Sequence, residues 1–177
     1  MEQEIAVLFG LSLSCNDDGY ASLKELERLC ETAGVLVCGK LFQRAKEITP
    51  ATYIGSGKVL ELKELIEKNG ANLAISDNEL SGSQVNNLSQ ALGVKVVDRT
   101  TLILDIFAKR ALSNEGKLQV ELAMLKYYLP RLSGISGTSG RFGSGGVGMR
   151  GPGEQSLNLT SEKLSSKFKS LRRKLKK

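Results

Sequence analysis

The sequence lacks histidine and tryptophan entirely and has only three cysteines and three prolines among its 177 residues. Without histidine, the chain has neither the commonest general base nor the usual zinc ligand. Ser-His and Cys-His nucleophiles are excluded for the same reason. The odd number of cysteines, with no CxxC spacing, indicates free thiols in a reducing cytosol. The composition therefore offers no catalytic or metal site in this chain and predicts a cytoplasmic protein.

Long apolar runs are also missing. No stretch approaches the roughly 20 apolar residues that a membrane helix needs. The first residues, Met1–Glu4, are acidic, whereas a secretory signal begins with basic residues. We therefore expect neither a membrane partner nor export. A hydrophobic fraction of 41% and a charged fraction of 25% are ordinary for a globular protein.

Charge is divided unevenly along the chain. Residues 1–98 contain 9 Lys/Arg and 14 Asp/Glu, a net −5, whereas residues 99–177 contain 16 Lys/Arg and 5 Asp/Glu, a net +11. Eight basic residues and one acidic residue lie between Thr160 and Lys177. This division predicts two units with different partners, the second suited to a polyanion. The alternative is a lysine-rich surface that is merely solvated.

Residues 1–98 alternate between short apolar runs and helical patterns. Four runs are strand candidates: Ile5–Phe9, Val35–Cys38, Leu73–Ile75 and Val94–Val97. Between them, Ser22 and Ser81 each begin a pattern typical of a helix capping box. This alternation predicts an α/β domain over 1–98 with a small, mostly parallel sheet and flanking helices. Continuous apolar strands fit such a sheet because both of its faces are covered.

Residues 99–177 show helical patterns and no strand signal. A helix over about 100–129 is predicted, capped by Thr100 or Thr101 and stopped by Pro130. At 1.5 Å per residue it would be roughly 45 Å long and would project from the domain. Its leucines repeat at intervals of four, three and four residues from Leu118 onward, which is the spacing of a coiled-coil seam.

A glycine-rich segment separates this helix from a second one. Residues 133–153 contain nine of the 19 glycines, which predicts a loop. A second helix over about 160–177 carries a matching apolar seam at Leu164, Phe168, Leu171 and Leu175. Two such seams can bury each other, so we predict an antiparallel hairpin over 99–177 with the glycine-rich loop at its tip. The alternative is an isolated basic tail.

Two glycine patterns resemble phosphate-binding motifs but fail. Gly55–Lys58 looks like the end of a P-loop, yet Thr52 stands where the first glycine is required and Val59 follows the lysine. Gly143–Gly148 satisfies G-x-G-x-x-G, but it follows a long helix and a loop instead of a strand. Neither pattern predicts a nucleotide site, so no cofactor is expected in this chain.

Three arginines, Arg131, Arg141 and Arg150, lie in or beside the glycine-rich loop. Guanidinium groups pair with phosphates and stack on unpaired bases. Glycine lets a backbone approach a ligand closely. This combination predicts that the tip of the hairpin inserts into a crevice of a folded RNA. The alternative is a disordered connection with incidental arginines.

The α/β domain supports a second hypothesis, a small-ligand or nucleotide-binding domain. Ligands of parallel sheets favour the carboxyl ends of strands, here near Cys38–Lys40 and Ser76–Asn78. Asp77 and Glu79 lie at the second place, but carboxylates between a strand and a helix are more often turn and first-turn residues.

Several long strings in the sequence are similar to those of the HflX family of GTPases. They are Asp98–Thr100, Leu102–Ala108, Gly116–Ala123, Pro130–Leu132 and Gly145–Glu154. Shorter similarities lie upstream at Gly55–Val59, at Glu79–Ser81 and at Gln84, Asn87 and Leu88. The resemblance is strong from about Tyr53 to Leu157 and covers most of the chain.

The resemblance implies an N-terminal α/β domain, a helical hairpin and a following GTPase domain that binds GTP and Mg²⁺. It also implies binding to rRNA of the large ribosomal subunit, with the hairpin loop directed toward the peptidyl-transferase centre, and for some members ribosome splitting under stress. The expected RNA-contacting residues are basic residues and glycines of the hairpin: Arg131, Arg141, Gly145, Gly146, Arg150, Gly151, Gly153, Lys163, Lys167, Arg172 and Arg173.

Two departures from the family pattern qualify this expectation. After Gly153–Glu154 the family usually continues with Thr-Gln-Leu-Glu and an Asp-Arg-Arg triplet, whereas Gln155–Asn158 and Thr160–Lys163 stand here. The second helix therefore belongs to a divergent branch. The chain also ends at Lys177, where the GTPase domain should begin. We expect a fragment of a longer protein, unable to hydrolyse GTP by the family's route. A third hypothesis is that this region regulates the GTPase domain through contacts made by the hairpin.

Overall fold

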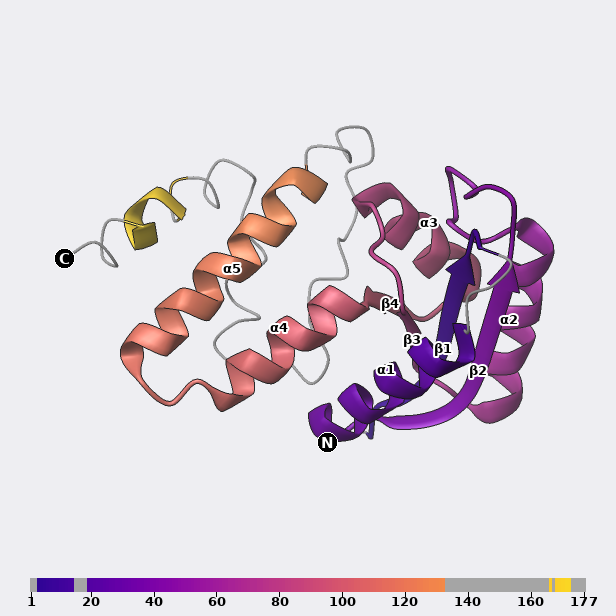
Figure 1. Ribbon diagram of the computed structural model, residues 1–177, viewed down its shortest axis with the longest axis horizontal. Helices are drawn as coiled ribbons and strands as arrows, with labels where there is room; N and C mark the ends of the chain where they lie inside the picture. Colours follow the sequence, from indigo (N-terminus) through magenta and orange to yellow (C-terminus); the bar gives the residue numbers. More distant parts are fainter. Residues whose placement is uncertain (1–2, 15–18, 133–165, 167, 173–177) are drawn as a thin grey trace.

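Strands and helices alternate through most of the chain (Figure 1). The computed structural model describes residues 3–14, 19–132, 166 and 168–172. In chain order the elements are β1 (Ile5–Ser12), α1 (Gly19–Ala33), β2 (Leu36–Arg44), α2 (Ser56–Asn69), β3 (Leu73–Ser76), α3 (Gly82–Leu92), β4 (Lys95–Asp98), α4 (Arg99–Arg110) and α5 (Asn114–Leu132).

The four strands form one parallel sheet in the order β2-β1-β3-β4. Val7 of β1 is opposite Ala74 of β3, and Ala74 is opposite Val96 of β4. The chain therefore adds β2 on one side of β1 and β3 on the other. The predicted α/β fold, a small parallel sheet with flanking helices, is confirmed.

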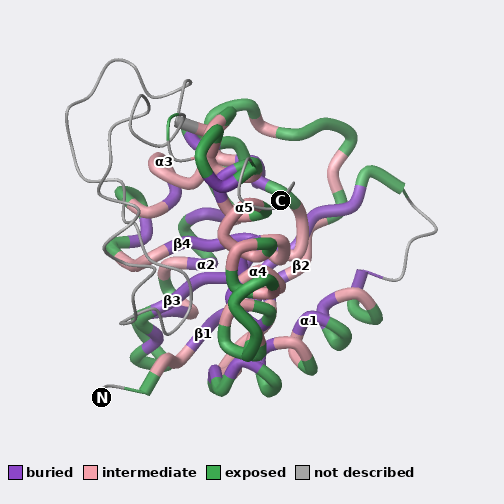
Figure 2. Tube along the Cα trace, turned by 90° about the vertical axis from the view of Figure 1, so that its left-hand side faces the viewer, coloured by how far each residue is buried: buried purple, intermediate pink, exposed green. Residues whose placement is uncertain are grey.

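Helices cover both faces of the sheet, which explains the continuous apolar strands. On one face, Val7 and Phe9 pack with side chains of α2 and α3, including Leu62 and Leu88. On the other face, Ala6 and Leu8 pack with side chains of α1 and α4. Figure 2 shows β1, β3 and β4 as mainly buried, β2 as mainly intermediate, and the outer sides of the helices as exposed. Since α4 contributes Leu102 and Ile106 to the second core cluster, the boundary predicted at residue 98 falls just before a helix that packs on the sheet.

One predicted helix cap is confirmed and two are wrong. The Ser81 side chain accepts from the Gln84 amide while the Gln84 side chain accepts from the Ser81 amide. Ser22 is not a cap, because α1 begins earlier, at Gly19, and the Ser22 hydroxyl donates to Asp77. The cap of α4 is Asp98 instead of Thr100 or Thr101, since its carboxylate accepts from the Thr101 amide.

The single projecting helix predicted over 100–129 is also wrong, because two helices occupy this region. Ala111 ends α4 with an extended backbone (φ −70°, ψ 106°). The Ser113 hydroxyl then accepts from the Gly116 amide at 3.0 Å, the bond of a helix N-cap, and α5 begins. The break lets α5 fold back beside α4 toward the α/β domain (Figure 1).

The prediction that Pro130 stops the helix is wrong, because Pro130 lies inside the last turn of α5. One of the last carbonyls, that of Tyr127, instead receives a hydrogen bond from the Arg131 side chain at 2.9 Å. The described part of the second helix, 168–172, packs on α5: Leu171 is buried against Leu125, with Phe168 beside them. This agrees with the predicted seam, whereas the predicted loop over 133–153 lies outside the described residues.

Burial of Cys30, on the core-facing side of α1, makes stability depend on pH. Burial, aided by the charges of Glu27 and Glu31, raises the pKa of this thiol from 9.0 to about 12. Above pH 9 the unfolded chain therefore releases this proton while the folded chain keeps it, so the free energy of unfolding falls as pH rises.

We expect Cys30→Ala to flatten this fall by at most about 1.4 kcal/mol per pH unit. Urea unfolding at several pH values between roughly 8 and 11 measures the slope. Cys38→Ala is the control, because Cys38 is only partly buried and its pKa is raised less by its surroundings. Equal slopes for the wild type and Cys30→Ala would contradict the assignment.

Candidate nucleic-acid interface

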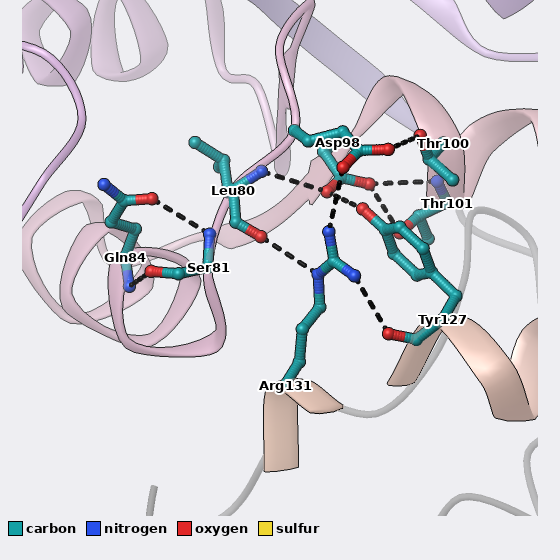
Figure 3. A network of polar contacts seen from close by, with 9 residues as sticks. Leu80, Ser81, Gln84, Asp98, Thr100, Thr101, Tyr127 and Arg131 are labelled. Atoms are coloured by element: carbon teal, nitrogen blue, oxygen red, sulfur yellow. Dashed lines mark hydrogen bonds and ion pairs between the residues drawn. The ribbon is translucent and has the colours of Figure 1, made fainter. Parts of the chain in front are cut away.

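A buried carboxylate connects the helical extension to the α/β domain (Figure 3). Asp98 is 2% exposed and is the last residue of β4. Its Oδ1 accepts from the amide and the hydroxyl of Thr101 in α4, at 2.9 and 2.8 Å. Its Oδ2 accepts from the Leu80 amide at 3.2 Å and from the Tyr127 hydroxyl of α5. One side chain therefore holds the β3–α3 connection, the start of α4 and the last turns of α5 together.

Arg131 completes this connection from the last turn of α5 (Figure 3). Its Nε donates to the Leu80 carbonyl at 3.0 Å, and its Nη2 lies 3.4 Å from the Glu79 carboxylate. The guanidinium carbon is 3.5 Å from the centre of the Tyr127 ring, a cation–π contact. We refer to Leu80, Asp98, Tyr127 and Arg131 together as the joint.

Tyr127 of the joint and its neighbour Tyr128 both have raised pKa values. Burial, and after it the charge and hydrogen bond of Asp98, raise the pKa of Tyr127. Burial also raises the pKa of Tyr128 to about 12, although a hydrogen bond with Thr101 lowers it. Tyr127 therefore acts as a hydrogen-bond donor to a charged acceptor, an arrangement stronger than a neutral hydrogen bond.

The structure locates two of the basic residues predicted to contact RNA. Arg131 is in the joint, with 19% of its side chain exposed and with partners within the protein. Arg172 is exposed on the described part of the second helix, beside α5. The other predicted residues lie outside the described residues: Arg141, Gly145, Gly146, Arg150, Gly151, Gly153, Lys163, Lys167 and Arg173.

The carboxyl edge of the sheet matches the alternative ligand site only in part. Cys38–Lys40 lies in the middle of β2, because this strand continues to Arg44, so that half of the prediction is wrong. Asp77 does follow the end of β3, but its carboxylate accepts from Ser22 at 2.5 Å and pairs with Arg99 at 3.1 Å. Polar groups at this edge therefore bind one another.

Two side chains of α3 donate hydrogen bonds to the backbone of the loop between β2 and α2. The Gln84 side chain donates to the Pro50 carbonyl at 3.2 Å, and the Asn87 side chain donates to the Ala51 carbonyl at 3.0 Å. These bonds give a structural role to two residues of the strings that resemble the HflX family. They hold the loop that contains Tyr53, whose φ of 66° is rare outside glycine.

Gly55–Lys58, the segment that resembles the end of a P-loop, forms the start of α2. Gly55 caps α2 without a side-chain bond, and the Lys58 ammonium pairs with Glu61 at 2.6 Å. Within the described ranges, no group of three His, Cys, Asp or Glu side chains could hold a metal ion. None of the helices described is both long and apolar enough to cross a membrane.

Sequence reasoning missed Asp98 and Tyr127 as parts of a site. A local signal existed for the first, because an aspartate three residues before Thr101 is a favourable helix N-cap. No local signal existed for the second, since Tyr127 meets Asp98 only because the chain reverses at 111–113. Glu79, predicted to be a turn residue, also bonds to α4, accepting from Thr100 at 3.0 Å.

The fold and the joint define an α/β domain fixed to a helical extension, and sequence comparison identifies the class as GTP-binding proteins. Residues 20–108 match the family model described as "GTP-binding GTPase N-terminal". Residues 110–177 match the one described as "GTP-binding GTPase Middle Region". The chain belongs to the HflX family of GTPases, as its N-terminal region.

Curated relatives and solved structures agree with this assignment. The chain is 51% identical over 174 residues to GTPase HflX of Caldanaerobacter subterraneus, covering 98% of the chain and 40% of that relative. It is 39% identical to GTPase HflX of Escherichia coli over 153 residues, covering 86% of the chain and 35% of the relative. The chain thus spans about 40% of the length of the Caldanaerobacter relative.

Two crystal structures share the fold. A GDP complex of SsGBP superimposes with a TM-score of 0.66 at 24% identity, covering 98% of this chain and 44% of that one. The G235S variant of SsGBP gives a TM-score of 0.60 at 28% identity, covering 76% of this chain and 42% of that one. The arrangement of the sheet and its helices is therefore not peculiar to this chain.

The Asp98 carboxylate should contribute measurably to stability. Asparagine is as good a helix N-cap as aspartate, so Asp98→Asn keeps the cap of α4. With Oδ1 kept on Thr101, the amide nitrogen takes the place of Oδ2 and accepts no hydrogen bond, so both the Leu80 amide and the Tyr127 hydroxyl lose their acceptor. We expect a loss of roughly 2–3 kcal/mol in the free energy of unfolding, measured with urea.

Glu79→Gln is the matched control, since it neutralises a carboxylate beside the same joint. The Glu79 side chain is 66% exposed, so its pair with Arg131 is screened by solvent. We expect this variant to stay within about 0.5 kcal/mol of the wild type. Equal losses in the two variants would show that burial of Asp98 is not what matters.

Proposed function

We propose that this chain is the ribosome-binding part of an HflX-type GTPase and binds rRNA of the large ribosomal subunit. The contacts are assigned to the glycine-rich segment 133–153, with Arg141 and Arg150, and to basic residues of the second helix. Among the latter are Lys163, Lys167, Arg172 and Arg173. The glycines of the segment, including Gly145, Gly146, Gly151 and Gly153, allow its backbone to approach phosphates and bases closely.

The observation that carries this proposal is the charge of the helical half. Residues 99–177 have a net charge of +11, against −5 for residues 1–98. Neutralising RNA phosphates releases condensed counterions, so clustered lysines and arginines favour binding to a polyanion. Arg172 is exposed on the second helix beside α5, where its guanidinium is accessible to such a ligand. Membership in the HflX family supports the same partner.

The rest of the full-length protein is proposed to supply the chemistry. The curated relatives are named GTPases, and this chain spans 40% of the relative from Caldanaerobacter. We assign GTP binding, with Mg²⁺, to a GTPase domain outside these 177 residues, and that domain is a partner of this chain. Ribosome splitting or rescue under stress, in the cytoplasm, would be the outcome of the two parts acting together.

Binding of the purified chain to large ribosomal subunits tests the proposal. We expect co-sedimentation at low salt that weakens as salt is raised, since each neutralised phosphate contributes to the salt dependence. The double variant Arg141→Glu/Arg150→Glu should bind at least tenfold more weakly, about 1.4 kcal/mol or more. Its logarithmic dependence on salt should also be shallower.

Lys24→Glu/Lys68→Glu is the charge-matched control. Lys24 and Lys68 are exposed on α1 and α2 of the acidic domain, and the variant changes the net charge by the same amount. It should bind almost as the wild type does. Equal losses for both double variants would reduce the interaction to net charge alone, and unchanged binding of the arginine variant would refute the role assigned to the glycine-rich segment.

A further inference from the structure

α5 is attached to the α/β domain mainly through polar groups. Among the described residues, no side chain of α5 belongs to either apolar cluster that covers the sheet. Its buried leucine, Leu125, packs instead with Leu171 of the second helix. The polar bonds of the joint therefore connect the end of α5 to the β3–α3 connection and to the end of β4, while α5 also lies against α4.

The other connection, the segment between α4 and α5, is poorly suited to fix an angle. Ala111 is extended, and Leu112 is 90% exposed and so packs on almost nothing. A short connection of this kind can act as a hinge, because few contacts oppose a change in its backbone angles. The joint lies at the opposite end of α5, far from the connection at 111–113. It therefore opposes a rotation of α5 about that connection most effectively.

Arg131 is better suited to hold this position than to bind RNA. Each of its three guanidinium nitrogens donates to an acceptor within the protein: Leu80, Tyr127 or Glu79. One face of the group is covered by the Tyr127 ring. All of these contacts hold α5 on the α/β domain or brace its last turn, so the group is largely occupied within the protein.

We propose that Asp98, Tyr127 and Arg131 are positioning residues for RNA binding. They fix the end of α5 on the α/β domain, so that the α/β domain and α5 meet the RNA as one rigid body. The glycine-rich segment follows α5 in the sequence. This inference rests on the proposed function. Rigidity favours binding because the helix is then already ordered before it meets its partner.

The conservative variants Arg131→Lys and Tyr127→Phe test this role in the full chain. Lysine keeps the positive charge but loses the planar fork that reaches Leu80 and Tyr127 together. Phenylalanine keeps the ring beneath Arg131 and removes only the bond to Asp98. We expect both variants to bind large ribosomal subunits about tenfold more weakly at every salt concentration, with an unchanged salt dependence.

Amide hydrogen exchange of the free protein provides a readout that does not involve RNA. The Leu80 amide donates to Asp98, so it should exchange faster in both variants, while amides of β1 remain as protected as in the wild type. Arg172→Lys is the control. It alters an exposed arginine of the second helix and should leave the exchange of Leu80 unchanged.

The outcomes separate positioning from direct contact. Wild-type affinity in Arg131→Lys, with weak binding and a shallower salt dependence in Arg131→Gln, would assign a phosphate contact to Arg131 and overturn the inference. Normal binding by Tyr127→Phe despite faster exchange at Leu80 would overturn it too. If the wild type binds no subunits at low salt, the proposed function fails, and the role in RNA binding fails with it.

Discussion

The structure depends on the burial of one carboxylate at the meeting point of three elements. Asp98 is 2% exposed, and removing such a charge from water is costly unless hydrogen bonds replace its hydration. Four donors do so, from the β3–α3 connection, the first turn of α4 and the end of α5. Each element thus satisfies a charge that the others bury, which makes the sheet, α4 and α5 interdependent.

The sheet and most of its helices could be predicted from the sequence because their signals are local. Runs such as Leu73–Ile75 are apolar throughout, and Ser81 with Gln84 forms a capping box within four residues. The break between α4 and α5 could not be predicted in this way, because residues 111–113 contain neither glycine nor proline. Ser113 was the available signal, and the regular leucine spacing on both sides of it concealed the break.

The candidate site was only partly predictable for a related reason. Basic residues near a glycine-rich segment are visible in the sequence, and so is the resemblance to a family. Whether an arginine is free to meet a ligand depends on distant partners. Arg131 bonds to Leu80 and Glu79, which are 51 and 52 residues away in the chain. No spacing rule contains that information, because it arises only when the chain reverses between α4 and α5.

The joint fixes a helix of the basic part of the chain relative to the acidic α/β domain. An acidic unit of net −5 and a basic unit of +11 would orient independently near RNA if they were flexibly linked. The joint holds α5, a described part of the basic unit, on the acidic α/β domain, so under the proposed function the acidic domain has a set orientation relative to α5 when RNA approaches. Electrostatic attraction of this kind acts chiefly on the rate and orientation of encounter. Under the proposed function, this attraction favours one orientation of the α/β domain because Asp98, Tyr127 and Arg131 keep α5 in place.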